Sequence, residues 1–80
     1  MEKIHVLLVE DELTLAMIIK DTLEEQEFII TTASDGEEGL RTFFAQKPDI
    51  VVADVMMPRM DGFEMVRRIR QTDKLTPVLF

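Results

Sequence analysis

Short runs of apolar residues alternate along this chain with longer stretches in which apolar residues recur every three or four positions. Continuous runs rich in Val and Ile are typical of buried parallel strands, and we find them at residues 4–9, 28–33, 49–53 and 77–80. The stretches between them are typical of helices that bury one face. The pattern therefore predicts the element order β-α-β-α-β-α-β.

The three predicted helices each have an apolar face. These faces are expected at Leu15, Ile18, Ile19, Thr22 and Leu23 in the first helix, Leu40, Phe43 and Phe44 in the second, and Phe63, Val66 and Ile69 in the third. Ser34, Asp35 and Gly36 offer turn and N-cap chemistry to the second helix, and the third is expected to end near Thr72. Because the connections are short enough for right-handed crossovers, we expect an α/β fold with an open parallel sheet and helices on both faces.

Composition narrows the class of protein. A chain of 80 residues, 46% hydrophobic and 31% charged, is enough for one small globular domain. Its net charge of −7 argues against direct binding of nucleic acid or of an anionic membrane by this segment. The absence of Cys excludes thiolate metal sites. The apolar run from Val6 to Val9 is too short for a signal peptide or a membrane span, so a cytoplasmic protein is expected.

Acidic residues follow two of the predicted strands. Glu10 and Asp11 come directly after the first strand, and Asp54 comes directly after the third. If these strands are neighbours, three carboxylates converge at the carboxyl edge of the sheet, where open α/β sheets bind ligands. A hard divalent cation, Mg²⁺ or Mn²⁺, would relieve their repulsion, and a carboxylate beside it is a plausible nucleophile toward a phosphoryl group. The alternative is that these acids are solvated loop residues, with Glu10-Asp11-Glu12 supplying only an N-cap.

Three segments together resemble the receiver domain of two-component response regulators. They are LLVEDE at the end of the first strand, DIVVADVMMPRMDGFE around the third, and TPVLF opening the fourth. The resemblance covers all 80 residues and implies a flavodoxin-like, CheY-like sheet. It also implies that residues 1–80 are a truncated receiver domain that lacks the fourth helix, fifth strand and fifth helix, with no output domain.

The resemblance implies roles for individual residues. Asp54 would be the phosphoacceptor, receiving a phosphoryl group from the phosphohistidine of a sensor histidine kinase or from a phosphotransfer domain. Asp11, Asp54 and the backbone carbonyl of Met56 would bind Mg²⁺ directly, and Glu10 would complete the pocket through a water. Such a module would catalyse only its own phosphorylation and dephosphorylation, and is not otherwise an enzyme.

The family also uses a Ser or Thr at the end of the fourth strand and a Lys at the end of the fifth. Neither position falls within residues 1–80, and neither Thr76 nor Lys74 is placed to substitute. We therefore expect this segment to be unable to complete the conformational switch of the family. An unfinished fourth-strand edge would also favour self-association by strand pairing.

Two other functions fit parts of the pattern. A Mg²⁺-dependent phosphohydrolase with an aspartyl nucleophile would carry a second acid two residues after it, but Asp54-Val55-Met56 lacks that acid. A degenerate receiver used only for protein docking is disfavoured by the complete set of acids. His5 is interpreted as structural, the methionines as packing residues, and Arg67, Arg68 and Arg70 as a solvated face. Glu27 is expected as a left-handed helix cap, and Gly39 as a weak point of the second helix.

Overall fold

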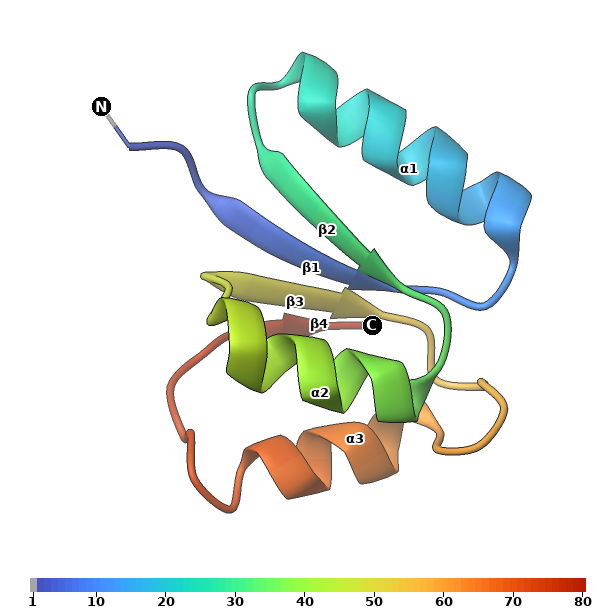
Figure 1. The fold of residues 1–80 in the computed structure, drawn as a ribbon, viewed down its shortest axis with the longest axis vertical. Helices are drawn as coiled ribbons and strands as arrows, with labels where there is room; N and C mark the ends of the chain where they lie inside the picture. The colour runs from blue at the N-terminus through green and yellow to red at the C-terminus, as the bar shows by residue number, and fades with distance from the viewer. Residues whose placement is uncertain (1) are drawn as a thin grey trace.

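A computed structural model describes residues 2–80 and shows four parallel strands with three helices (Figure 1). The spatial order of the strands is β2-β1-β3-β4, and every neighbouring pair is parallel. This confirms the predicted α/β fold and the predicted order of elements. The elements are β1 (His5–Val9), α1 (Leu13–Glu25), β2 (Ile29–Ala33), α2 (Gly36–Gln46), β3 (Ile50–Ala53), α3 (Gly62–Ile69) and β4 (Val78–Leu79).

The pairing of β1 with β3 places the ends of these two strands side by side. Their register aligns Val6 with Ile50 and Val9 with Ala53, so both strands end at the same level. The strand order also reverses here, because the chain moves from β1 outward to β2 and then returns to the other side of β1. Such a reversal is where open α/β sheets bind ligands, beyond the carboxyl ends of the strands.

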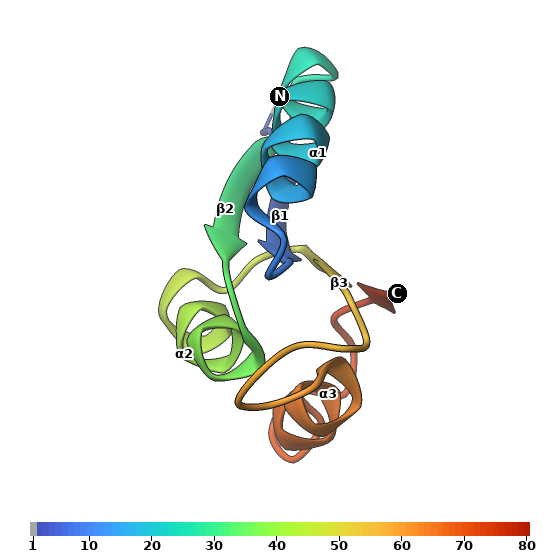
Figure 2. The same cartoon turned by 90° about the vertical axis from the view of Figure 1, so that its right-hand side faces the viewer.

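The helices form two unequal layers around the sheet. Helix α1 lies on one face, and α2 and α3 lie together on the other (Figure 2). Alternate strand residues therefore enter different cores, as the two-residue period of a strand requires. Leu7, Val9, Val51 and Ala53 pack toward α2 and α3, where Met65 and Ile69 are also completely buried. The core under α1 is smaller, and consists of Val6, Leu8, Ala16 and Ile30 with partly buried neighbours.

Two of the expected helix faces are rotated from their predicted positions. In α1 the inward residues are Ala16, Ile19 and Leu23, whereas Ile18 is 58% exposed. In α3, Met65 and Ile69 point inward and Phe63 is 62% exposed. The small Ala16 lets α1 approach the sheet, and Phe63 instead makes an edge contact with Phe80, with ring centroids 5.2 Å apart. The predicted face of α1 was therefore wrong at Leu15, Ile18 and Thr22, and that of α3 was wrong at Phe63, because these side chains are exposed. In α2 the prediction was wrong only at Phe44, which is 46% exposed.

The predicted helix ends were correct in two cases and wrong in one. Asp35 is the N-cap of α2 and accepts a hydrogen bond from the Glu38 amide at 2.8 Å. Glu27, just after α1, has a left-handed φ of 70°, as predicted. Helix α3 ends at Ile69, earlier than predicted. Within residues 2–80, no helix combines the length and apolar character needed to cross a membrane.

Gly39 has a packing role that its low helix propensity did not indicate. A Cβ at this position would lie 2.8 Å from the Met65 sulfur and 3.0 Å from Val9 Cγ2. The absence of a side chain therefore lets α2 approach both β1 and α3. Gly39 lowers the intrinsic stability of α2 but allows the close packing of the larger core.

The packing role predicted for the methionines holds for Met57, Met60 and Met65, which are buried, and is wrong for Met56. Experiment can separate these core and surface residues. Because Met65 is fully buried and Met56 is 81% exposed, Met65→Ala should lower the free energy of unfolding by about 2–5 kcal/mol. The matched Met56→Ala variant should change it by no more than about 0.5 kcal/mol. Urea unfolding followed by circular dichroism measures both values, and equal effects would contradict the packing described above.

Candidate metal centre

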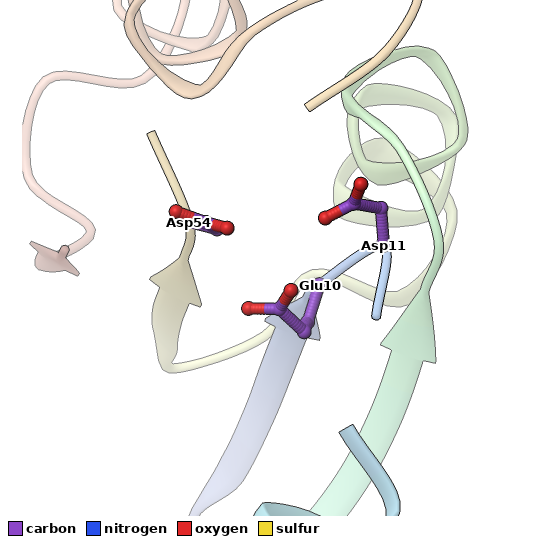
Figure 3. A group of neighbouring side chains, drawn as sticks. All are labelled: Glu10, Asp11 and Asp54. Atoms are coloured by element: carbon purple, nitrogen blue, oxygen red, sulfur yellow. The ribbon is translucent and has the colours of Figure 1, made fainter. Parts of the chain in front are cut away.

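Three carboxylate groups meet at the carboxyl edge of the sheet. One oxygen from each of Glu10, Asp11 and Asp54 lies within 4.8 Å of the other two. Figure 3 shows that Glu10 and Asp11 extend from the end of β1 and that Asp54 extends from the end of β3, with the three groups surrounding a common space. The structure therefore brings together the three side chains that the sequence indicated.

Backbone hydrogen bonds continue the sheet to the acidic residues themselves. The Glu10 amide donates to the Ala33 carbonyl at 3.0 Å, and the Asp54 amide donates to the Val9 carbonyl at 3.0 Å. These bonds join Glu10 to β2 and Asp54 to β1. Glu10 is buried, with only 7% of its surface exposed, whereas Asp11 is exposed and Asp54 is intermediate. Glu10 and Asp54 are thus held at fixed positions by the sheet.

Two roles were considered for Glu10-Asp11-Glu12, a helix N-cap and a metal site, and they apply to different residues of this segment. Glu12 is the N-cap of α1, and its carboxylate accepts hydrogen bonds from the amides of Thr14 at 3.1 Å and Leu15 at 2.8 Å. Glu10 accepts one from the Glu12 amide at 3.1 Å. Because Glu12 satisfies the start of the helix, Asp11 and the remaining oxygen of Glu10 are available at the cluster.

The electrostatics of the cluster favour a cation. Burial raises the pKa of the Glu10 carboxyl above its usual value; the Glu12 amide opposes this effect, and the neighbouring Asp54 and Asp11 add to it. Among residues 2–80, none of the ion pairs joins a Lys or Arg to these three acids. Three clustered oxygen donors without a basic partner suit a hard divalent ion such as Mg²⁺ or Mn²⁺.

Two cavities border the cluster. One of about 440 Å³ is lined by Asp11, Met56 and Asp61 together with Val55, Met57 and Pro58. The other, of about 290 Å³, is lined by Glu10, Asp54 and Phe80 among other residues. Met56 therefore borders the same cavity as Asp11. Phe80 is a neighbour of the site that the sequence did not indicate, because it lies 26 positions after Asp54.

Residues outside the cluster behave mainly as predicted. His5, in the first position of β1, shares a hydrogen bond of 2.7 Å between its Nε2 and Thr31 Oγ1. This places its imidazole at the opposite end of β1 from Glu10 and supports a structural role. Arg67 and Arg68 pair with Glu64 on the solvent side of α3. One contact that sequence patterns did not indicate is an ion pair between Arg59 and Asp35 at 2.9 Å.

The arrangement of acids at the sheet edge agrees with a match between this sequence and a known protein family. The model of the response regulator receiver domain matches residues 6–80.

The chain belongs to the response regulator receiver domain family. Receiver domains are signalling modules of two-component signal transduction rather than classical enzymes. Among curated proteins, this receiver domain is 44% identical over 73 residues to the transcriptional regulatory protein AfsQ1 of Streptomyces coelicolor, covering 91% of the chain and 32% of AfsQ1. It is 39% identical over 74 residues to PhoP of Bacillus subtilis, an alkaline phosphatase synthesis transcriptional regulatory protein, covering 92% of the chain and 31% of PhoP. The chain thus spans about a third of the length of these curated relatives.

Solved structures share the fold of this receiver domain. The chemotaxis response regulator CheY4 of Vibrio cholerae is 33% identical, with a TM-score of 0.92 over 96% of this chain and 66% of that one. TrrA of Thermotoga maritima, solved in complex with Mg²⁺-BeF, is 37% identical, with a TM-score of 0.85 over 89% of this chain and 62% of that one. The fold comparison and the family comparison therefore agree.

The raised pKa of Glu10 predicts how the metal-free receiver domain responds to pH. An acid whose pKa is higher in the folded state than in the unfolded state binds more protons when the protein is folded. Its contribution to folding stability is fully present below the pKa of the unfolded state, and it is lost as the pH rises through the pKa of the folded state. Glu10→Gln removes this loss. In the presence of a chelator, the melting temperature of Glu10→Gln should exceed that of wild type increasingly as pH rises from about 4 to about 7.

Glu64 provides a control of opposite sign. Arg67 and Arg68 lower the pKa of Glu64 to about 2. The contribution of Glu64 to folding stability is therefore present above the pKa of the unfolded state, and it is lost as the pH falls through the pKa of the folded state. Glu64→Gln should therefore lower the melting temperature near neutral pH, by an amount that shrinks as the solution is acidified. Parallel pH profiles for the two variants would contradict the raised pKa of Glu10.

Proposed function

We propose that this receiver domain accepts a phosphoryl group on Asp54 in a reaction that depends on Mg²⁺ or Mn²⁺. The observation that carries the proposal is the cluster of Glu10, Asp11 and Asp54 at the reversal point of a receiver-domain sheet. Asp54 is the only one of the three that extends from β3, and it faces acids from the neighbouring strand rather than a base. The solved complex of TrrA with Mg²⁺-BeF lends support from a relative.

The chain's own groups suit an in-line transfer. A carboxylate oxygen of Asp54 attacks the phosphorus and forms a P–O bond, while the bond between phosphorus and the donor nitrogen breaks and its electron pair remains on the imidazole. The result is an aspartyl phosphate and a histidine returned to the donor. The hydrogen bond from the Asp54 amide to Val9 holds the nucleophile in place, so little reorganisation is needed on attack.

The residues that would hold the metal are Asp11 and Asp54, with the backbone carbonyl of Met56. Glu10, which is buried beside them, would take part through a water. When bound, the cation would offset the charge of Asp54 and of the incoming phosphoryl group, which would otherwise repel each other. The all-oxygen donor set and the lack of a basic partner, among residues 2–80, fit this ion better than zinc.

The donor we propose is a sensor histidine kinase or a phosphotransfer domain, and the protein is proposed to act in the cytoplasm. The family and the acidic cluster support this partner, because both point to transfer onto aspartate. Three earlier expectations remain predictions: that residues 1–80 are a truncated receiver domain, that they cannot complete the switch alone, and that the β4 edge promotes self-association. The structure shows β4 paired with β3, consistent with the strand order on which the last of these rests.

Phosphorylation should depend on Asp54. Incubation with acetyl phosphate and Mg²⁺ should add the mass of one phosphoryl group to the wild-type protein, and intact-mass spectrometry should find no such adduct on Asp54→Asn. Asp21→Asn is the matched control, because it removes an exposed aspartate of α1 outside the cluster, and it should be phosphorylated like wild type. An adduct that persists in Asp54→Asn would assign the acceptor elsewhere.

Metal binding can be measured without phosphorylation. Because the cation binds only the folded cluster, Mg²⁺ at 100 times its Kd should stabilise the wild-type protein by about 2.7 kcal/mol. Asp11→Asn removes one proposed ligand and should weaken Mg²⁺ binding by about tenfold or more, with a smaller rise in melting temperature at the same concentration. Asp21→Asn should keep the wild-type response. An unchanged response in Asp11→Asn would exclude that residue as a ligand.

A further inference from the structure

The loop between β3 and α3, residues 54–61, contains both Asp54 and Met56, and we call it the acceptor loop. Met57 and Met60 are both buried in the larger core, with 9% and 8% of their surfaces exposed. At its end, the Gly62 amide donates to the Val55 carbonyl at 2.8 Å. Met56 lies between these anchors and is itself 81% exposed, so its own side chain contributes little to its position.

A further anchor of the acceptor loop is an ion pair with the start of α2. Arg59 donates from Nη1 to Asp35 Oδ2 at 2.9 Å, while Asp35 Oδ1 accepts from the Glu38 amide at 2.8 Å. Only 8% of the Asp35 side chain is exposed, compared with 64% for Arg59. Both oxygens of a buried carboxylate are thus occupied, one by the helix and one by the loop. A charge-assisted bond to a buried carboxylate is stronger than an exposed ion pair.

The backbone supports the same connection. Arg59 has a φ of 66°, in the left-handed region that side chains rarely adopt, and such a conformation persists only where the surroundings hold it. The next residue, Met60, lies so close to α2 that a Cβ on Gly36 would fall 1.9 Å from its carbonyl oxygen. The acceptor loop therefore rests directly on the first turn of α2, at the point where Arg59 reaches Asp35.

We propose that the Asp35–Arg59 ion pair is a positioning device that fixes the acceptor loop, and with it the Met56 carbonyl, relative to Asp11 and Asp54. This inference rests on the proposed metal-dependent function of the same site. Neither residue is among the three clustered acids, so both act through the loop and not on the reacting atoms. The ion pair joins Asp35, between β2 and α2, to Arg59 in the acceptor loop, and these two residues are 24 positions apart in the sequence.

A purely electrostatic role for Arg59 predicts the opposite result, which makes the proposal testable. Removing a positive charge from the acceptor loop would strengthen the attraction between the three carboxylates and a divalent cation. Loss of positioning weakens cation binding instead, because one ligand carbonyl is no longer held in place. The direction of the change in Mg²⁺ affinity upon Arg59→Gln therefore separates the two roles.

The experiment titrates Mg²⁺ into ¹⁵N-labelled protein and follows backbone amide shifts by NMR. Arg59→Gln should weaken Mg²⁺ binding by about tenfold, at the lower end of outer-shell effects on metal sites. Asp35→Asn keeps an N-cap acceptor for α2 but loses the charge that pairs with Arg59. The double variant should bind no more weakly than Arg59→Gln alone, because both substitutions break one interaction. Arg59→Lys should recover part of the affinity.

Arg67→Gln is the matched control. It removes the same charge and also breaks an ion pair, but on the exposed side of α3 with Glu64. It should leave Mg²⁺ affinity unchanged or slightly increased. A second measurement needs no metal: amide hydrogen exchange at residues 56–60 of the metal-free protein should accelerate in Arg59→Gln and remain at the wild-type rate in Arg67→Gln.

The outcomes separate this inference from the function on which it rests. If wild type binds Mg²⁺ and Arg59→Gln binds it equally well or more tightly, the positioning role is overturned and the metal site stands. If exchange at residues 56–60 is unchanged in Arg59→Gln, the ion pair does not hold the loop and the proposal fails. If wild type does not bind Mg²⁺ at all, the proposed function falls and the inference falls with it.

Discussion

The parallel pairing of β1 with β3, with both strands ending at the same level, is the constraint on which the site depends. Val9 aligns with Ala53, and the next residue of each strand carries a carboxylate. A shift of the register by one residue would turn the side chains of β3 to the opposite face and move Asp54 away from Glu10. The register is fixed because Leu7, Val9, Val51 and Ala53 share one buried core. Burial of apolar side chains thus determines the position of the acids.

This arrangement brings together groups that repel one another, and backbone hydrogen bonds from Glu10 to Ala33 and from Asp54 to Val9 hold two of them in place. Glu10 is buried against its neighbours, and its raised pKa records the unfavourable environment of its charged form. The amides at the start of α1 could otherwise have bound one of these acids, but Glu12 accepts their hydrogen bonds instead. The acidic cluster is therefore available for a ligand, at some expense in stability when no cation is bound.

Sequence patterns predicted the features that depend on residues close together in the chain. An apolar run followed by an acid, combined with the rules for parallel sheets, was enough to place Glu10, Asp11 and Asp54 together. The rotation of α1 and α3 was predicted less well, since periodicity identifies apolar residues but not which of them faces the sheet, as Ile18 and Phe63 show. The Arg59–Asp35 contact followed no periodic pattern, and Arg59 adopts a conformation more common for glycine. Such contacts depend on tertiary structure alone.

The way the helices begin has a consequence for the electric field of the whole molecule. Each helix is capped by an acid at its amino end: Glu12, Asp35 and Asp61. Because the crossovers return the chain to the same edge of the sheet, the helices begin at the edge where the strands end (Figure 1), and Glu10, Asp11 and Asp54 cluster at that edge. Carboxylates therefore gather at this edge, and the positive amino ends of the three helix dipoles offset part of their charge. A small anion that approaches this edge meets the remaining negative charge, and dissolved salt screens that repulsion.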